Sequence, residues 1–357
     1  MKLLDKYVEH KIIHTGQNYD YELNEVFYKE LDLRKPDYFL NINTSSMGKI
    51  YGETLIKSEE ILVKENPDAV LILGDTNSSI AGIIAKRLQI PIYHVEAGNR
   101  SFDQNVPEEI NRKIIDHIAD FNLVYTQRSK EHLIAEGYPH RRIYICGSPI
   151  TEIFKSFEKK VSQSNILEKL KLAKNDYFLV STHRQENIDK EENLLKILEV
   201  LNSIAEYFEK KIIVSTHPRT RDKLSSIDKV TLSSNIVFLK PFGFFDYLNL
   251  QINSKCVISD SGTISEEAAI LDFPAVTLRK SMERPEAIDS GSIMLTGLDK
   301  ETVLKAIEIT TKQHKIKQAK HIPEDYKINN TSWRIIKLIL GTYKLSNVWN
   351  GIDKIKR

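Results

Sequence analysis

Short apolar runs rich in β-branched residues recur along the chain, separated by longer segments whose apolar positions repeat with helical spacing. This alternation predicts parallel strands with helices on both faces of the sheet, the doubly wound α/β arrangement. The predicted strands fall into two sets, one at 11–14, 69–73, 90–95, 122–125 and 143–146, the other at 178–181, 211–215, 236–239, 256–259, 275–277 and 292–295. Each set is expected to build one sheet.

The segment from Thr151 to Asp176 is charged and helix-forming, and it has no strand pattern. We therefore place a domain boundary there, with one Rossmann-like domain over residues 1–150 and a second over 151–330, as the length of 357 residues favours. A cleft is expected between them. Helices are predicted over 301–311 and 332–343, the second with an apolar face of Trp333, Ile336 and Leu340. Residues 331–357 are expected to pack back toward the first domain.

The beginning of the chain departs from this pattern. Residues Met1 to Val8 resemble the last turns of a helix, and they lead directly into the first predicted strand. In a doubly wound sheet, a strand and a glycine-rich turn normally precede that helix. We expect that this strand and turn are absent here.

Composition narrows the class of protein. Hydrophobic residues make up 41% and charged residues 28%, with a net charge of +2 and basic residues scattered, so nucleic acid is not an expected partner. No apolar run is long enough to span a bilayer and Met1 to Tyr7 does not read as a signal peptide, which predicts a cytoplasmic protein without membrane insertion. Cys146 and Cys256 are isolated in apolar runs and are predicted to be buried, with neither a disulfide nor a zinc site.

Polar residues follow the first set of strands, where an open parallel sheet gathers its functional side chains. Asp75 lies in Gly-Asp-Thr, which a turn or helix cap explains as readily as a catalytic carboxylate does. Glu96 ends the next strand, in His-Val-Glu-Ala-Gly-Asn-Arg. Glu108 and Arg112 are four apart in a helix that begins after proline, so an ion pair between them is predicted, with Glu109 pointing elsewhere. Ordinary helix capping would also explain these acids.

The second set of strands ends in groups suited to anions. His183 with Arg184, and His217 with Arg219, follow neighbouring strands; a single histidine there is usually structural, but two with arginines favour an anion site. Asp260 to Glu267 runs from a strand through small residues into a helix, whose first N–H groups are a ready phosphate cradle. Arg284 follows another strand, within reach of a diphosphate. No standard dinucleotide or ATP loop pattern occurs.

Taken in order, these segments resemble the non-hydrolysing UDP-N-acetylglucosamine 2-epimerase family over nearly the whole chain. The matching pieces are His14 to Asp20, Gly74 to Thr76, His94 to Arg100, Pro107 to Arg112, His183-Arg184, Asp260 to Glu267 and Glu283 to Glu286. Glu96 to Gln104, Lys240 to Tyr247 and Asp260 to Thr263 are similar to one branch in particular. That branch converts UDP-2-acetamido-2,6-dideoxy-L-talose to UDP-N-acetyl-L-fucosamine for capsule or O-antigen synthesis.

The resemblance implies two GT-B-like Rossmann-type domains, usually in a homodimer, and a UDP-N-acetylated sugar as substrate. It also implies a reaction without NAD or metal, in which UDP is eliminated to a glycal and added back. Carried over by motif, Asp75, Glu96 and Glu108 are the acid and base candidates, with Arg112 and His183 beside them; their separate roles stay open. The implied UDP-binding residues of the second domain are His183, Arg184, Tyr247, Ser261, Gly262, Glu267 and Arg284.

Family members begin with a strand that ends in Gly-Thr-Arg-Pro-Glu, and this sequence starts after it. The absence of that strand predicts unpaired backbone groups and an exposed apolar slot in the first sheet, with weak or no activity. Two other readings stay open. A GT-B glycosyltransferase would share the two domains but needs an acceptor site, and a UDP-sugar-binding remnant would bind without turnover. UDP-N-acetylglucosamine is the alternative substrate.

Overall fold

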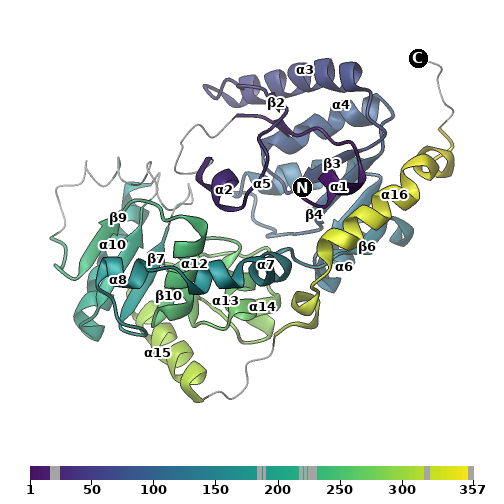
Figure 1. Ribbon diagram of the computed structural model, residues 1–357. Helices are drawn as coiled ribbons and strands as arrows, with labels where there is room; N and C mark the ends of the chain where they lie inside the picture. The colour runs from purple at the N-terminus through teal and green to yellow at the C-terminus, as the bar shows by residue number, and fades with distance from the viewer. Residues whose placement is uncertain are drawn as a thin grey trace. The chain divides into compact units, whose positions relative to one another are not determined.

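The computed structural model describes residues 1–16, 25–182, 187, 190–216, 220, 223, 231–316 and 322–352. The predictions on His183, Arg184, His217 and Arg219, and on Gln17 to Asp20, lie outside these residues. The chain divides into two compact units (Figure 1). Unit 1 comprises Met1–Asn24, Leu31–Glu152 and Asp325–Arg357, and unit 2 comprises Glu25–Glu30 and Ile153–Glu324.

Unit 1 contains two parallel sheets, so the expectation that the first set of predicted strands builds one sheet is wrong: the first predicted strand pairs with a strand that was not predicted. The larger has the order β3-β4-β5-β6, formed by Val70–Leu73, Ile92–Ala97, Phe121–Val124 and Ile143–Ile145, and the smaller pairs β1 (Ile13–His14) with β2 (Tyr38–Phe39). The helical elements of this unit are α1 (Leu4–Tyr7), α3 (Met47–Glu65), η2 (Asn77–Ile80), α4 (Ala81–Arg87), α5 (Glu108–Ile118), α6 (Gln127–Ala135), η3 (His140–Arg142), η4 (Glu324–Lys327) and α16 (Thr331–Trp349).

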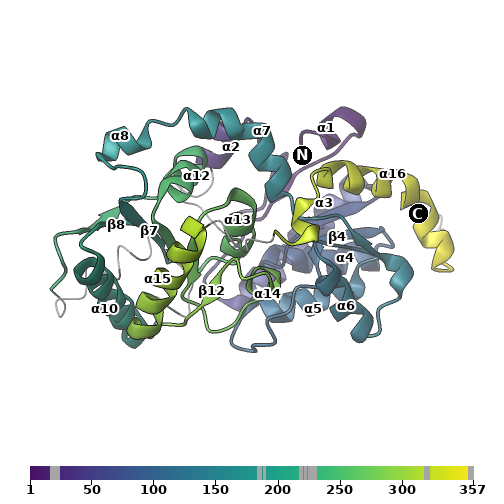
Figure 2. The ribbon, with the colours of Figure 1, turned by 90° about the horizontal axis from the view of Figure 1, so that it is seen from below.

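Helices cover both faces of the larger sheet. On one face, Leu62 of α3, Ala85 of α4 and Ile115 of α5 pack with Ile92 of β4 in one buried cluster. On the other face, α16 lies along the sheet in both views (Figures 1 and 2) and packs Ile335, Leu338 and Ile339 against it. The predicted face of α16 is therefore wrong in part: Ile336 is buried, but Trp333 and Leu340 are exposed. The residues that pack on the sheet, Ile335, Leu338 and Ile339, lie beside the predicted positions, so the predicted stripe is displaced around the helix.

Strands β1 and β3 are edge strands of their sheets. The alternate residues Leu71 and Leu73 of β3 are 38% and 66% exposed, whereas every residue of β5 is buried. A hydrogen bond of 2.7 Å joins the hydroxyl group of Thr15, which follows β1, to that of Ser78 in η2, the helical turn after β3. Unit 1 thus presents an apolar strand edge, which is the kind of surface on which further strands pair.

Unit 2 has one parallel sheet of order β12-β11-β10-β7-β8-β9. The strands are β7 (Tyr177–Ser181), β8 (Lys211–Ser215), β9 (Ile236–Leu239), β10 (Cys256–Ser259), β11 (Ala275–Thr277) and β12 (Met294–Leu295). The described helices are α2 (Glu25–Glu30), α7 (Ile150–Ser162), α8 (Ile166–Leu170), α10 (Glu191–Phe208), α12 (Phe244–Asn253), α13 (Ile264–Leu271), α14 (Glu286–Asp289) and α15 (Lys300–Ile316). Its core joins α10 and α15 to the strands through residues such as Leu201, Ile258 and Ile307.

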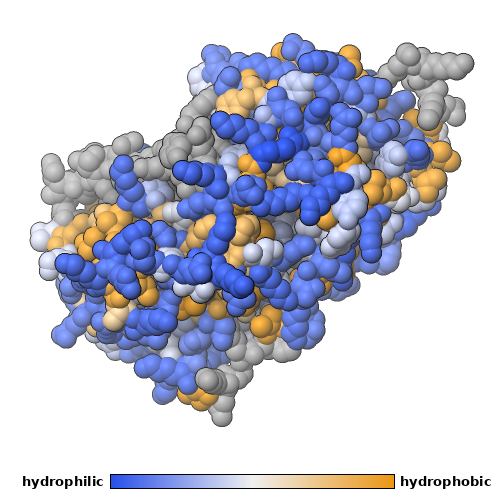
Figure 3. All heavy atoms as spheres, in the orientation of Figure 1, coloured by the Kyte–Doolittle hydropathy of each residue, from blue (hydrophilic) through white to orange (hydrophobic). Residues whose placement is uncertain are grey.

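The predicted fold class is confirmed, since both units are parallel α/β structures and every predicted strand exists within two residues of its expected bounds. Both cysteines are buried, as predicted. On the face shown in Figure 3, apolar residues lie in several separate patches among hydrophilic ones, which is usual for a surface that contacts water. Within the described part of the chain, no helix is both long enough and apolar enough to cross a membrane.

Candidate functional site

The first cluster of predicted site residues lies at the carboxyl edge of β3 and β4 in unit 1. Gly74 follows β3 with φ +76°, a conformation that favours glycine, and a Cβ placed on it would lie 3.6 Å from Oε2 of Glu96. His94 Nε2 lies 3.0 Å from the Gly74 carbonyl oxygen, which ties the two strand ends together. The turn that carries Asp75 therefore sits beside the Glu96 carboxylate.

Glu96 itself has an unusual backbone. Its φ is +73° within strand β4, and the pairing register with β5 shifts between Val95 and Ala97. A non-glycine residue in the left-handed region costs free energy, and such residues concentrate at functional sites. The Asn99 side chain donates to the Glu96 carboxylate at 3.4 Å. The bulge thus gives Glu96 a direction that a regular strand would not.

Arg112 of α5 connects the two acidic segments. Its Nε donates to Asp75 Oδ2 at 2.5 Å and its Nη1 donates to Glu109 Oε2 at 3.0 Å. Glu109 is fully buried and also accepts from the backbone N–H groups of Ser101 and Phe102. The sequence prediction that Glu109 points elsewhere is wrong, because the i, i+3 position also faces Arg112 and lies on the inward side of the helix. Glu108, the predicted partner, is half-buried at the helix start.

The pKa of Glu109 is lowered despite its position. Burial alone would raise it, but hydrogen bonds from Ser101 and Arg112, together with the positive charge of Arg112, outweigh that effect. The Glu109 carboxylate is thus kept ionised and orders the segment that follows β4. In this role it is a structural support for Arg112.

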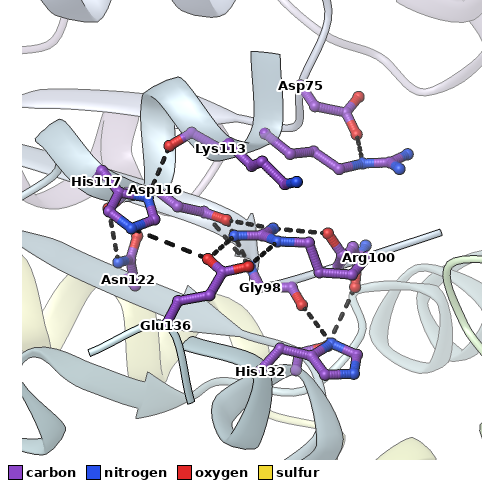
Figure 4. A network of polar contacts seen from close by, with 12 residues as sticks. Asp75, Gly98, Arg100, Lys113, Asp116, His117, Asn122, His132 and Glu136 are labelled. Carbon is purple, nitrogen blue, oxygen red and sulfur yellow. Dashed lines mark hydrogen bonds and ion pairs between the residues drawn. The ribbon is translucent and has the colours of Figure 1, made fainter. Parts of the chain in front are cut away.

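Behind this edge lies a charge cluster of His94, Arg100, Asp116 and Glu136, of which the last three are labelled in Figure 4. Asp116 of α5 lies 2.8 Å from His94 Nδ1 and accepts from Arg100 Nη1 at 2.7 Å. Arg100 also donates Nε and Nη2 to the two oxygens of Glu136, at 2.7 and 2.6 Å, in a bidentate pair. The side chains of Arg100 and Asp116 are fully buried.

The cluster shifts the pKa of its carboxyl groups downward. For Asp116, burial acts to raise the pKa, and the hydrogen bonds and charges of His94 and Arg100 reverse that effect. The hydrogen bond from Arg100 lowers the pKa of Glu136. Both carboxyls are therefore ionised when the protein is folded at neutral pH, and their charges need cationic partners inside the unit.

The second cluster lies at the carboxyl edge of the sheet in unit 2. Glu267 of α13 accepts from Gln251 of α12 at 2.7 Å. Burial, followed by the charge of Glu267, raises the pKa of Tyr247 in α12, which keeps its hydroxyl protonated. The side chains of Ser181 and Gln251 act in the opposite direction on the Tyr247 pKa, so residues of β7, α12 and α13 all lie near this hydroxyl. The predicted residues Tyr247 and Glu267 are brought together.

The turn before α13 is organised by its own hydroxyl groups. The backbone N–H of Ser261 donates to Ser259 Oγ at 3.1 Å, and the Ser261 and Thr263 hydroxyls lie 3.0 Å apart. Gly262 lies between them, half-buried. A helix start of this kind directs backbone N–H groups outward, which suits an anionic ligand.

Arg284 also belongs to this cluster. Its Nε lies 3.5 Å from Oε1 of Glu266, a residue of α13 that is 1% exposed. A second pair joins Arg279 to Glu283 at 2.5 Å. Arg284 is therefore held beside the first turn of α13 by a buried carboxylate, which keeps its positive charge close to the predicted phosphate cradle. In the described part of the chain, no group of three His, Cys, Asp or Glu side chains is arranged to hold a metal ion.

Sequence reasoning missed Glu109, Asp116 and Glu136. A signal existed for two of them, because Glu109, Arg112 and Asp116 stand at i, i+3 and i+7 of one helix and so share a face. A charged face opposite an exposed Ile110 indicates a helix whose inward side is polar. Glu136, at the end of α6, had no comparable signal because its partner is 36 residues away.

Two parallel α/β units, one with neighbouring carboxylates at its strand edge and the other with a helix start suited to an anion, are typical of enzymes that act on nucleotide-linked substrates. Comparison with known proteins makes this specific. The sequence model of the family described as UDP-N-acetylglucosamine 2-epimerase matches residues 2–340. A UDP-N-acetylglucosamine 2-epimerase of Methanococcus maripaludis is 38% identical over 342 residues, which are 93% of this chain and 92% of that protein.

Solved structures of similar proteins support the same family assignment. The structure of a UDP-N-acetylglucosamine 2-epimerase from Rickettsia bellii has a TM-score of 0.89 and 42% identity, covering 97% of this chain and 92% of that one. A Methanocaldococcus jannaschii UDP-GlcNAc 2-epimerase, in complex with UDP-GlcNAc and UDP, has a TM-score of 0.88 and 36% identity over 95% of this chain and 94% of that one. The chain belongs to the UDP-N-acetylglucosamine 2-epimerase family and is an isomerase of the UDP-sugar 2-epimerase type.

Proposed function

We propose that this enzyme inverts C2 of a UDP-linked 2-acetamido sugar, using the carboxylates Asp75, Glu96 and Glu108 of unit 1 for proton transfer. The observation that carries the proposal is the placement of Asp75 beside Glu96, with Arg112 bonded to Asp75 at 2.5 Å. Two acidic side chains at one strand edge, one of them on a strained backbone, suit general acid and base catalysis.

The chemistry has two halves. A carboxylate removes the proton from C2, the C1–O bond to the diphosphate breaks, and a C1=C2 double bond forms, which gives a glycal and free UDP. In the reverse half, a protonated group delivers a proton to the opposite face of C2, and UDP oxygen bonds again to C1. Because C2 carries no strongly activating group, the base must be held at a fixed position.

Departure of UDP requires groups that stabilise negative charge on the diphosphate. The start of α13 at Ser261 and Gly262, and the Arg284 guanidinium beside Glu266, suit this role in unit 2. Glu267, already bonded to Gln251, suits a ribose hydroxyl. His183 and Arg184 complete the proposed UDP-binding set by motif.

The structural and sequence relatives favour UDP-N-acetylglucosamine as the substrate to test first, since several carry that name. The motif from Glu96 to Gln104 favours a second candidate, UDP-2-acetamido-2,6-dideoxy-L-talose. A relative of Pseudomonas aeruginosa that is 33% identical over 83% of this chain is a UDP-2,3-diacetamido-2,3-dideoxy-D-glucuronate 2-epimerase, so the sugar varies among similar proteins. Cytoplasmic location, a homodimer and a role in surface polysaccharide synthesis are further parts of this proposal.

Solvent-deuterium exchange at C2, followed by NMR, tests the proposal. The purified protein is incubated in heavy water with UDP-N-acetylglucosamine or with UDP-N-acetyl-L-fucosamine, the product of the second candidate reaction. Deuterium at C2 together with a new epimer is the expected result, and the sugar that reacts identifies the substrate. A folded protein that binds UDP-sugar without exchange would overturn the proposal and support a binding remnant.

Variants assign the carboxylates. Asp75→Asn, Glu96→Gln and Glu108→Gln are each expected to slow exchange by roughly 100-fold or more, the usual contribution of a positioned acid or base. Glu131→Gln is the matched control, because Glu131 in α6 contacts only the exposed Gln127 side chain among the hydrogen bonds of the described residues. A Glu108→Gln enzyme with the exchange rate of the control would remove Glu108 from the proposed set.

A further inference from the structure

His94 stands between two hydrogen-bond acceptors. Its Nδ1 lies 2.8 Å from the Asp116 carboxylate and its Nε2 lies 3.0 Å from the Gly74 carbonyl oxygen. An ionised carboxylate and a backbone carbonyl can only accept. The ring is 1% exposed, so water cannot easily replace either partner.

A neutral imidazole has one N–H, so one of its nitrogens would point a lone pair at an oxygen about 3 Å away. The imidazolium donates to both acceptors. We infer that His94 is held as an imidazolium and acts as a positioning residue, fixing through the Gly74 carbonyl the turn that carries Asp75.

The charges around the ring are compatible with this protonation state. Asp116 and Glu136 bring two negative charges, and Arg100 brings one positive charge, so an imidazolium at His94 makes this set of four residues neutral overall. Glu136 is the most exposed of the four, with 25% of its side chain exposed, and its Oε2 lies 4.0 Å from His117 Nε2. Charged groups reach the ring from α5 through Asp116, with Arg100 and Glu136 behind it, and the Gly74 turn adds Asp75 on the other side.

The functional part of this inference rests on the proposed role of Asp75. The Gly74 carbonyl belongs to the peptide group that links Gly74 to Asp75, so its hydrogen bond sets the orientation of the Asp75 backbone. Arg112 then fixes the Asp75 carboxylate from α5, the helix that also carries Asp116. Displacement of a reacting group by about 1 Å costs roughly 100-fold in rate. His94 therefore fixes the position of the Asp75 carboxylate, and that carboxylate takes part in the proposed proton transfer.

The protonation state is tested without any substrate. In ¹⁵N-histidine-labelled protein at about pH 7.5, an exposed histidine is mostly neutral, whereas both ring nitrogens of His94 are expected to carry a proton. The signal is assigned by its loss in His94→Gln, and His132, whose Nδ1 contacts the single acceptor Gly98 oxygen at 3.0 Å, is the internal reference. One bare nitrogen on His94 would overturn the inference.

The positioning role is tested by kinetics of C2 exchange. His94→Gln can donate to one acceptor only, so kcat is expected to fall by roughly 100-fold with KM changed by less than about threefold. Tyr93→Phe is the matched control: Tyr93 is the preceding residue in β4, equally buried, and bonds to the Thr342 hydroxyl on the opposite face. An unchanged kcat in His94→Gln, or an equal loss in Tyr93→Phe, would contradict the positioning role.

The two tests separate this inference from the proposed function. A doubly protonated His94 in a wild-type protein that shows no C2 exchange would leave the buried imidazolium standing and refute the proposed reaction. An active wild type whose His94 ring has one bare nitrogen would refute the imidazolium and leave the reaction standing.

Discussion

Replacement of Arg100 with methionine should destabilise unit 1 strongly. The Arg100 side chain is fully buried and makes three hydrogen bonds to Asp116 and Glu136. Methionine has a similar length, but it leaves the fully buried Asp116 carboxylate without the guanidinium and the partly exposed Glu136 carboxylate without its bidentate partner. Removal of one partner from a buried ion pair costs about 3 to 5 kcal/mol. We expect a loss of this size at neutral pH.

The stability difference between the wild type and Arg100→Met should depend on pH in a defined direction. The pKa values of Asp116 and Glu136 are lowered in the folded protein, so their pairing with Arg100 stabilises the fold above the unfolded-state pKa values of about 3.9 and 4.3. This contribution is lost as the pH falls through the folded pKa values. The difference between the wild type and Arg100→Met should therefore be full at neutral pH and shrink below about pH 4.

Tryptophan fluorescence during urea unfolding measures the stability of unit 1, which contains Arg100. The chain has two tryptophans, Trp333 and Trp349, and both lie in α16, which belongs to unit 1. The control is Arg87→Met, since Arg87 is exposed in the last turn of α4 in the same unit, and a change within about 0.5 kcal/mol is expected. A deficit of Arg100→Met no larger than the control, or one independent of pH, would refute the reasoning.

Three further predictions concern other parts of the structure. Gly98→Ala should abolish folding of unit 1 or reduce its Tm sharply, because a Cβ would lie 2.2 Å from the Ser129 carbonyl oxygen and the backbone φ is +76°. Gly52→Ala in α3 is the control, since its Cβ meets nothing within 4 Å and the change should raise the free energy of unfolding by about 1 kcal/mol. Calorimetry measures both variants. Leu73→Lys on the exposed edge of β3 should reduce concentration-dependent association measured by light scattering, and unchanged association would exclude that edge as its cause. Glu109→Gln should lower kcat for C2 exchange by roughly tenfold or more through Arg112, and a wild-type pH profile and kcat would contradict this link.

The parallel strands could be predicted because each buried strand is a continuous apolar run that stands out between helical periods. Strand β2, which pairs with β1, could not be predicted in this way. Tyr38–Phe39 has only two residues in strand pairing, and Phe39 is exposed, so no run or alternation marks it. Pairing with β1 decides this strand, and pairing between distant segments leaves no local pattern.

The candidate site was predictable in position but not in its internal contacts. Placement after strands predicted that Asp75 and Glu96 lie at one edge of unit 1, as they do. Tyr247 was named only through the family resemblance, and it lies near Glu267 in unit 2. The partner of Arg112 was not predictable from spacing, because i, i+3 and i, i+4 neighbours are equally close on a helix. Burial decided between Glu109 and Glu108, and burial depends on how α5 rotates against β4.

The inward face of α5 explains why such contacts are retained in the protein. Glu109, Arg112 and Asp116 occupy positions where apolar residues would pack at lower cost, since ionised groups lose their hydration when buried. Each of them is bonded to a residue at the end of β3 or in the segment after β4, namely Asp75, Ser101 or Arg100. A polar helix face therefore does what an apolar face cannot, because hydrogen bonds fix direction as well as distance. Departures from a simple apolar pattern are expected where function requires them, and here they fall directly behind Asp75 and Glu96, two of the three carboxylates proposed to move the C2 proton.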